Sequence, residues 1–224
     1  MSYSTLEVSR DGVVGWLVFD RPQAGNAINA TMFVELEAAW RELEADDSIR
    51  VVVNTGNGGA FQTGLDVVQL ASDKEALRAS SRQTRDFELA MTGWHCGVTK
   101  PVIAAVNGTC AGGGLHFVAD ADIVLAADTA TFLDPHVSVG QVSAFETIGL
   151  LKKAPMEAVT RMALVGRHER LGAERARQLG VVSEVIPLAE LRARAAELAR
   201  TIARHPAAEL ARRKAALWAV LETP

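Results

Sequence analysis

Cysteine is scarce in this chain, which has 224 residues and only two cysteines, Cys96 and Cys110. Their spacing fits neither a metal-binding motif nor a disulfide framework, so we expect both thiols to be reduced. Long apolar runs are also missing, and none approaches the roughly twenty residues that a membrane-spanning helix needs. Residues 1–11 contain no apolar signal core, which predicts a cytoplasmic protein.

An excess of positive charge is missing too. The chain has 23 lysines and arginines against 27 aspartates and glutamates, a formal charge of −4, which offers no electrostatic basis for binding nucleic acid. Neither G-x-G-x-x-G nor G-x-x-x-x-G-K-[ST] occurs, which disfavours a nucleotide-dependent dehydrogenase and a P-loop enzyme. The composition, 49% hydrophobic and 22% charged, is that of an ordinary globular protein, with no nucleic-acid or membrane partner expected.

Predicted strands and helices alternate over the first two thirds of the chain. Residues 6–9 and 14–19 are expected to form a β-hairpin. A helix capped by Asn29 or Thr31 should follow, because apolar residues recur there at helical spacing: Met32, Leu36, Trp40 and Leu43. Residues 49–54 and 102–106 are predicted strands, and residues 80–94 a longer helix. This alternation favours the α/β class.

From about residue 155 the pattern becomes mainly helical. Short helices are expected over residues 157–165 and 173–179, the second ended by Gly180. Two further apolar stripes have helical spacing: Leu188, Leu191, Ala195, Leu198 and Ile202, then Leu210, Leu217, Trp218 and Leu221. We therefore divide the chain into an α/β core that carries the site, residues 1–154, and a helical region, residues 155–224.

Two glycine-rich turns follow predicted strands, "TGNGGAFQTG" (55–64) and "GTCAGGGLHF" (108–117). Glycine lets the backbone approach a ligand closely, and the first turn of a helix has N–H groups without internal partners. Two such donors from separate turns can polarise a carbonyl group and stabilise an enolate or a tetrahedral oxyanion. Tight turns that serve packing alone are the alternative.

Four ordered motifs resemble the crotonase, or enoyl-CoA hydratase/isomerase, superfamily: "FDRPQAGNAIN" (19–29), "AFQTGLD" (60–66), "KPVIAAVNGTCAGGGLHFVADADIVLAAD" (100–128) and "ARQLGVVSEVIP" (176–187). The resemblance spans residues 6–221. It implies a ββα spiral core, a C-terminal helical region used to assemble a homotrimer or hexamer, and acyl-CoA thioester substrates with no cofactor. Many members continue with further helical sequence beyond the point where this chain ends, "LETP" (221–224).

The resemblance also implies an oxyanion hole formed by the backbone N–H groups of Leu65 and Gly113. The neighbouring residues of both turns are then expected to line the substrate: Gly64, Asp66, Gly112 and Gly114. Arg21 is a candidate for binding CoA. Arg82 and Arg85 could meet the CoA phosphates, although a solvated charged face is the more ordinary interpretation. Cys110 is expected to be buried and not to act as a nucleophile.

Histidine stands at both positions where hydratases of this superfamily usually carry a catalytic glutamate, His116 and His136. Neutral imidazole can act as a base near pH 7, and a pair can share one proton. The alternatives are a core histidine and a turn histidine; no third metal ligand is identifiable, so no metal is predicted. Possible orienting carboxylates are Asp120, Asp134 and Glu146. Glu146 is also a third-choice acid, because the superfamily more often has glycine or another small residue around that position.

The other histidines, His95, His168 and His205, are interpreted as peripheral. The segment "VSVGQVSAFETIG" (137–149) lacks the proline and glycines of related hydratases, which predicts an altered acyl pocket. Three functions remain open. The leading one is an enzyme of the enoyl-CoA hydratase/isomerase type with an atypical histidine acid–base pair. The others are a histidine-assisted hydrolase of acyl-CoA or β-dicarbonyl compounds, and a non-catalytic subunit that binds acyl-CoA.

Overall fold

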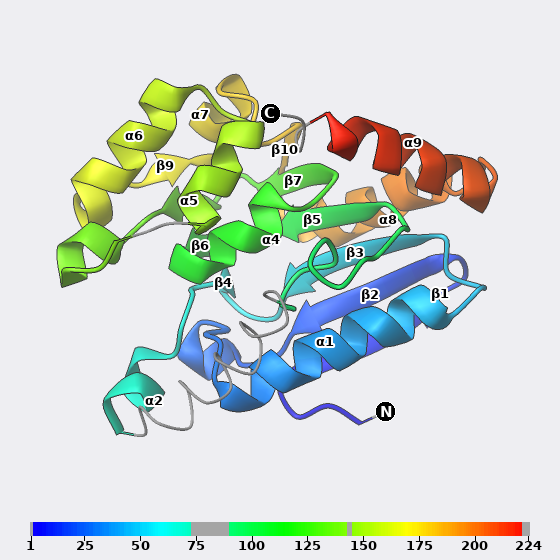
Figure 1. The fold of residues 1–224 in the computed structure, drawn as a ribbon, viewed down its shortest axis with the longest axis horizontal. Helices are drawn as coiled ribbons and strands as arrows, with labels where there is room; N and C mark the ends of the chain where they lie inside the picture. The colour runs from blue at the N-terminus through cyan, green and yellow to red at the C-terminus, as the bar shows by residue number, and fades with distance from the viewer. Residues whose placement is uncertain (1, 73–89, 143–144, 221–224) are drawn as a thin grey trace.

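The protein is described by a computed structural model that covers residues 2–72, 90–142 and 145–220. Its strands form two sheets (Figure 1). The larger sheet has six strands in the order β1 (Leu6–Asp11), β2 (Val14–Phe19), β3 (Val51–Gly56), β5 (Val102–Val106), β7 (Ile123–Ala127) and β10 (Glu184–Ile186). The smaller has four, in the order β4 (Ala60–Gln62), β6 (Thr109–Ala111), β8 (Thr131–Leu133) and β9 (Leu171–Gly172).

The chain passes from one sheet to the other in a repeated pattern. Each of β3, β5 and β7 in the larger sheet is followed by a short strand of the smaller one, β4, β6 or β8. Neighbouring strands from β2 through β10 are parallel, as are β4, β6 and β8, so every return needs a crossover. This arrangement confirms the predicted α/β class and the ββα spiral.

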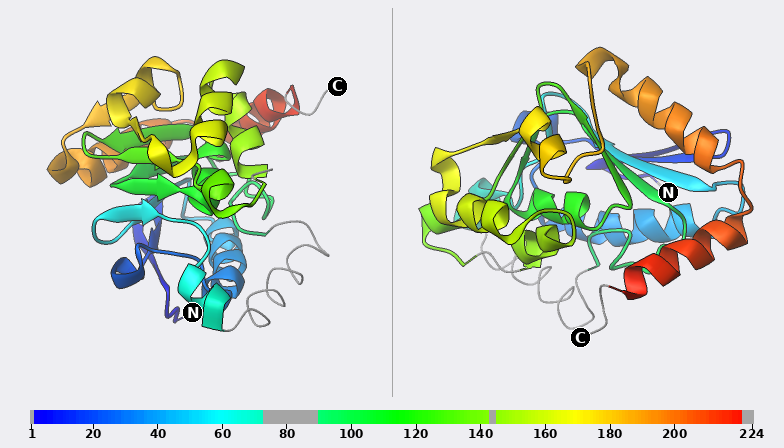
Figure 2. Two further views of the ribbon diagram at one scale, coloured as in Figure 1. Left: turned by 90° about the vertical axis from the view of Figure 1, so that its left-hand side faces the viewer. Right: turned by 90° about the horizontal axis from the view of Figure 1, so that it is seen from above.

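Helices cover both faces of the larger sheet (Figure 2). Helix α1 (Ala30–Ala45) packs on one face and α8 (Leu191–Ile202) on the other. The strands β3 and β5 are buried at every residue, as their continuous apolar sequences require between two helical layers. Asn29 caps α1 as predicted, since its side-chain oxygen accepts the Met32 N–H at 2.9 Å.

The region after residue 155 is mainly helical, as predicted. It contains α6 (Met156–Val165), α7 (Ala173–Gln178), α8 and α9 (Ala207–Ala219). However, it also supplies β10, which pairs in parallel with β7 and extends the core sheet. The boundary at residue 154 therefore marks a change in composition, while the sheet continues across it.

Among the described residues, three short α-helices lie in the first 154 residues or so of the chain: α2 (Val67–Ser72), α4 (Leu115–Ala119) and α5 (Phe145–Gly149). The helix predicted over residues 80–94 is wrong at its described end, because residues 90–94 form turns. Residues 80–89, with Arg82 and Arg85, lie outside the described residues, as does Leu221. Leu188 precedes α8 in a separate 3-10 turn.

Within residues 2–72, 90–142 and 145–220, no helix combines the length and the apolar character needed to cross a membrane. Several large apolar side chains are exposed on α5 and α9, among them Phe145, Ile148 and Leu217. Assembly into a trimer or hexamer stays a prediction.

Both cysteines are free thiols, as the sequence predicted. Burial raises the pKa of the Cys96 thiol to about 12 and also raises that of the fully buried Cys110. A protonated, inaccessible thiol is a poor nucleophile. The expectation that Cys110 is a packing residue is therefore supported.

Candidate active site

The turns that follow β4 and β6 meet at Gly64 and Gly113. A β-carbon on Gly64 would lie 3.0 Å from the amide nitrogen of Gly113 and 3.1 Å from the carbonyl oxygen of Ala111. Gly64 also has a φ of +87°, which residues with a side chain rarely adopt. Glycine at this position therefore lets the two turns touch and leaves the approach to the Gly113 amide open.

The backbone at Leu65 is held by a bridge to Ile28. The Ile28 N–H donates to the Gly64 carbonyl at 2.7 Å, and the Asp66 N–H donates to the Ile28 carbonyl at 2.9 Å. Because the C=O and N–H of a trans peptide point in opposite directions, the Leu65 N–H points away from Ile28. A β-carbon on Gly113 would lie 4.0 Å from the Leu65 nitrogen. The two predicted donors are therefore neighbours.

Gly114 has a different environment, because it packs against the smaller sheet. A β-carbon there would lie 2.2 Å from the carbonyl oxygen of Gln62, so the direction a side chain would take is filled by protein. We predict that Gly114→Ala lowers the free energy of unfolding by about 1–3 kcal/mol or more, as overpacking does. Urea denaturation measures this.

Gly59→Ala is the matched control, since a β-carbon at Gly59 would meet nothing within 4 Å. It should change the free energy of unfolding by less than about 0.5 kcal/mol, as surface substitutions do. A Gly114→Ala protein as stable as Gly59→Ala would contradict the packing described here.

Arg21 and Asp66 bind each other. Nη2 of Arg21 lies 2.9 Å from Oδ2 of Asp66, and the two side chains are 17% and 10% exposed. The other carboxylate oxygen of Asp66 accepts the Gln69 N–H at 3.0 Å and so caps α2. This pair stabilises the turn that carries Leu65. Contact of Arg21 or Asp66 with a substrate stays a prediction.

His136 follows β8 and is held by Asp134. Its backbone N–H and its Nδ1–H both donate to Oδ1 of Asp134, at 3.0 and 2.5 Å. Asp134 is completely buried and also accepts the Thr147 hydroxyl at 2.5 Å. The hydrogen bond to Asp134 raises the pKa of His136, although burial opposes this. The ring lies against the glycine turn, since a β-carbon on Gly112 would be 3.4 Å from its Cε1.

Glu146, at the start of α5, lies between the two histidines. Its Oε1 is 3.2 Å from Nε2 of His136, and its Oε2 is 3.8 Å from Nε2 of His116. The first distance allows a hydrogen bond and the second exceeds one. The Glu146 side chain is only 14% exposed. The sequence offered Glu146 as one of three possible orienting carboxylates, and the structure brings it to both rings.

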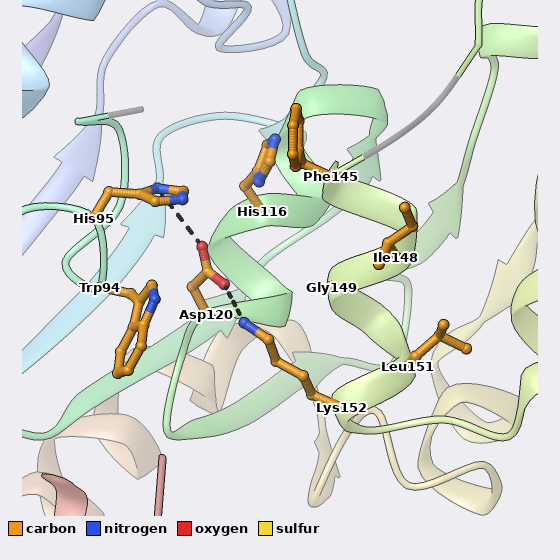
Figure 3. Close-up of a pocket in the computed structure, with 9 residues that line it drawn as sticks. All are labelled: Trp94, His95, His116, Asp120, Phe145, Ile148, Gly149, Leu151 and Lys152. Carbon is orange, nitrogen blue, oxygen red and sulfur yellow. Dashed lines mark hydrogen bonds and ion pairs between the residues drawn. The ribbon is translucent and has the colours of Figure 1, made fainter. Parts of the chain in front are cut away.

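His116 lies on α4 at the edge of a cavity of about 460 Å³ (Figure 3). Burial lowers the pKa of His116, and the nearby carboxylates of Glu146 and Asp120 offset this only in part. The surroundings of His116 therefore favour the neutral form of its ring. The cavity is lined by Trp94, His95, His116, Asp120, Phe145, Ile148, Gly149, Leu151 and Lys152. It combines apolar walls with a polar end.

His95 is not peripheral, contrary to the sequence interpretation. Its ring centroid lies 5.8 Å from that of His116, and its Nδ1 lies 3.8 Å from Oδ2 of Asp120. Figure 3 shows Asp120 between His95 and Lys152. The residues around His95 in the sequence gave no sign of this, because the contacts are made by His116 on α4 and by Asp120 directly after it.

His95, His116 and Asp120 offer possible metal-ligand atoms within 4.8 Å of one another. This group contains His116 but not His136, so it is not the His116–His136 site for which the sequence offered no third ligand. However, Asp120 accepts the Thr92 hydroxyl at 3.0 Å and pairs with Nζ of Lys152 at 3.2 Å. These partners compensate its charge, and we interpret the cluster as an ion-paired network. The prediction of no metal is kept as a prediction.

We predict that the two site histidines titrate on opposite sides of the ordinary imidazole pKa, about 6.5. The pKa of His136 should lie above this value because of Asp134, and that of His116 below it because of burial. NMR titration of the ring Cε1–H signals measures both. Asp134→Asn should lower the pKa of His136, and exposed His205 should not respond. A His136 pKa unchanged by this substitution would contradict the role of Asp134.

The two shifts affect the free energy of unfolding with opposite signs. Since the His136 pKa is raised on folding, its stabilising contribution is complete below about pH 6.5 and is lost as pH rises through the folded-state pKa. Since the His116 pKa is lowered, the fold loses stability as pH falls from about 6.5 through the folded-state pKa.

The sequence profile of the enoyl-CoA hydratase/isomerase family matches residues 10–224. The chain belongs to this family. A probable enoyl-CoA hydratase of Mycobacterium bovis is 35% identical over 202 residues, which cover 90% of this chain and 76% of that protein. A carnitinyl-CoA dehydratase of Escherichia coli is 35% identical over 205 residues, 88% of this chain and 74% of that one.

Solved structures of the family share the fold. The structure of an enoyl-CoA hydratase/isomerase from Mycobacterium paratuberculosis aligns with a TM-score of 0.85 and 36% sequence identity. The alignment covers 100% of this chain and 85% of the Mycobacterium chain. The structure of an enoyl-CoA hydratase/isomerase from Xanthobacter autotrophicus aligns with a TM-score of 0.88 and 29% identity. That alignment covers 99% of this chain and 81% of the Xanthobacter chain. The resemblance to the crotonase superfamily is therefore confirmed.

Proposed function

We propose that this chain is an acyl-CoA-processing enzyme of the enoyl-CoA hydratase/isomerase type. The thioester carbonyl oxygen would be bound by the backbone N–H groups of Leu65 and Gly113. The observation that carries the proposal is the contact between their two turns at Gly64 and Gly113, with the His136 ring next to Gly112. Such donors stabilise the negative charge that develops on the oxygen of an enolate.

The histidines support proton transfer next to that carbonyl. The surroundings raise the pKa of His136 and lower that of His116, so they favour the protonated form of one ring and the neutral form of the other. Titratable groups whose environments separate their pKa values are typical of acid–base sites. The cavity beside His116, about 460 Å³, is large enough for an acyl group. The names of the relatives, hydratase and dehydratase, favour addition or removal of water.

Hydrolysis is the second candidate, and the pairing of Asp134 with His136 favours it. A buried carboxylate that binds one nitrogen of an imidazole orients the other nitrogen for proton transfer. Such a ring can activate water for attack on a carbonyl carbon in the oxyanion hole. This would release free CoA from an acyl-CoA, or cleave a carbon–carbon bond in a β-dicarbonyl compound.

The test is an assay of the purified protein with crotonyl-CoA, cinnamoyl-CoA and acetoacetyl-CoA. Loss of the enoyl absorbance reports water addition, a thiol reagent reports free CoA, and mass spectrometry reports carbon–carbon cleavage. Binding of butyryl-CoA by calorimetry is followed in parallel. Water addition would support the leading proposal, and CoA release or cleavage the second.

Binding without any conversion would favour a non-catalytic acyl-CoA-binding subunit. A protein that neither binds butyryl-CoA nor converts any of the three esters would contradict the proposed function as a whole. His168→Asn is a suitable control, because His168 is exposed and outside the site.

A further inference from the structure

Glu146 divides its two carboxylate oxygens between the two site histidines. We propose that Glu146 is the acid–base residue of this site, with His136 holding the carboxylate and His116 positioning the reacting water. This inference rests on the proposed function and refines it, since it assigns the proton transfers to one residue. The carboxylate comes from α5, whereas histidines occupy the two positions where the superfamily usually carries glutamates.

The contacts of His136 argue that it does not exchange protons with the substrate directly. Asp134 binds its Nδ1 at 2.5 Å, and Glu146 lies 3.2 Å from its Nε2. Both ring nitrogens therefore face carboxylates, and both N–H groups of the imidazolium have acceptors within the protein. These two carboxylates favour the imidazolium form of the ring, which orients and stabilises Glu146.

The other oxygen of Glu146 faces His116 across 3.8 Å. This separation is too long for a direct hydrogen bond, but two atoms so placed can each bind the same third atom. Burial favours the neutral form of His116, and in that form its Nε2 can bind a water without adding charge. His116 also lines the cavity proposed for the acyl group. Water bound by Glu146 and His116 would thus lie beside that group.

In a hydration, Glu146 would accept one proton from water and later donate the same proton to the substrate. The water oxygen bonds to Cβ of the enoyl thioester while one O–H bond breaks and its proton passes to the Glu146 carboxylate. The electron pair of the C=C bond moves toward the thioester carbonyl and forms an enolate held by the two amides. Glu146 then gives the same proton to Cα. One water supplies both the hydroxyl group and the new hydrogen, and no further reactant is consumed.

The test compares Glu146→Gln with the wild type on crotonyl-CoA and cinnamoyl-CoA. We expect kcat to fall by about 10²–10⁴-fold, the range typical of a lost general acid–base group, with KM changed by less than about threefold because binding is retained. Glu146→Asp should recover part of the activity. Glu157→Gln is the matched control, since Glu157 is an exposed glutamate in the first turn of the next helix, α6.

NMR titration of His116 and His136 provides a second measurement, because their pKa values would not change if Glu146 only filled space. The charge of Glu146 raises the pKa of both His116 and His136, so Glu146→Gln should lower both values while Glu157→Gln leaves them unchanged. If Glu146→Gln keeps kcat within about threefold of the wild type, or leaves both histidine pKa values unchanged, the assignment is wrong. That failure is distinct from failure of the proposed function, in which the wild type itself neither binds nor converts a CoA ester.

Discussion

A Gly64→Ala variant is expected to lose about 10²–10³-fold in kcat/KM toward a CoA thioester. The added β-carbon would lie 3.0 Å from the Gly113 amide nitrogen, where it would obstruct an oxygen approaching that donor. Removing one oxyanion-hole donor costs about 2.7–4 kcal/mol of transition-state stabilisation. Steady-state kinetics with crotonyl-CoA, or with the ester found to react best, measures the loss.

Backbone strain has to be separated from this effect, because alanine at a φ of +87° is itself unfavourable. Gly12→Ala is the matched control. Gly12 also has a positive φ, +59°, but a β-carbon there would meet nothing within 4 Å. Positive φ should destabilise both variants by about 1–2 kcal/mol, the crowding at Gly64 should add to this for Gly64→Ala, and only Gly64→Ala should lose activity. Full activity in a folded Gly64→Ala protein would remove Gly113 from the proposed oxyanion hole.

His136→Asn is expected to lower kcat by about 100-fold or more and to leave binding of butyryl-CoA nearly unchanged. The variant removes the ring that lies 3.2 Å from Glu146 and holds its carboxylate in place, so the loss should approach that of the acid–base group itself. Asparagine can still donate a hydrogen bond to Asp134, so the turn after β8 should keep its conformation. Kinetics and calorimetry on the same preparation test both expectations.

Exposed His168 provides the control for histidine loss. His168→Asn should behave as the wild type, because its position lies outside the cavity and outside the contacts of Glu146. If His136→Asn folds and retains the kcat of the wild type, His136 has no part in the chemistry. Its hydrogen bonds to Asp134 would then have a structural role only.

Local sequence patterns predicted the elements of this fold well. The hairpin of β1 and β2, the cap of α1 by Asn29 and the helical character after residue 155 all depend on residues a few positions apart. The prediction of a helix over residues 80–94 is wrong for residues 90–94, which form turns. The apolar face of that predicted helix was poorly defined. The change in composition near residue 154 gave no sign that β10, which lies after it, pairs with β7 in the core sheet.

The sequence by itself determined the family, the two glycine turns and the replacement of two expected glutamates by histidines, because motifs and turn-forming glycines are local properties of the chain. Only the tertiary structure decided that Glu146 reaches both imidazoles and that His95 joins the cavity. The physical reason is that these contacts join α4, α5, the turn after β8 and the loop of residues 90–97. Their meeting depends on how separate elements pack, which no short stretch of sequence encodes.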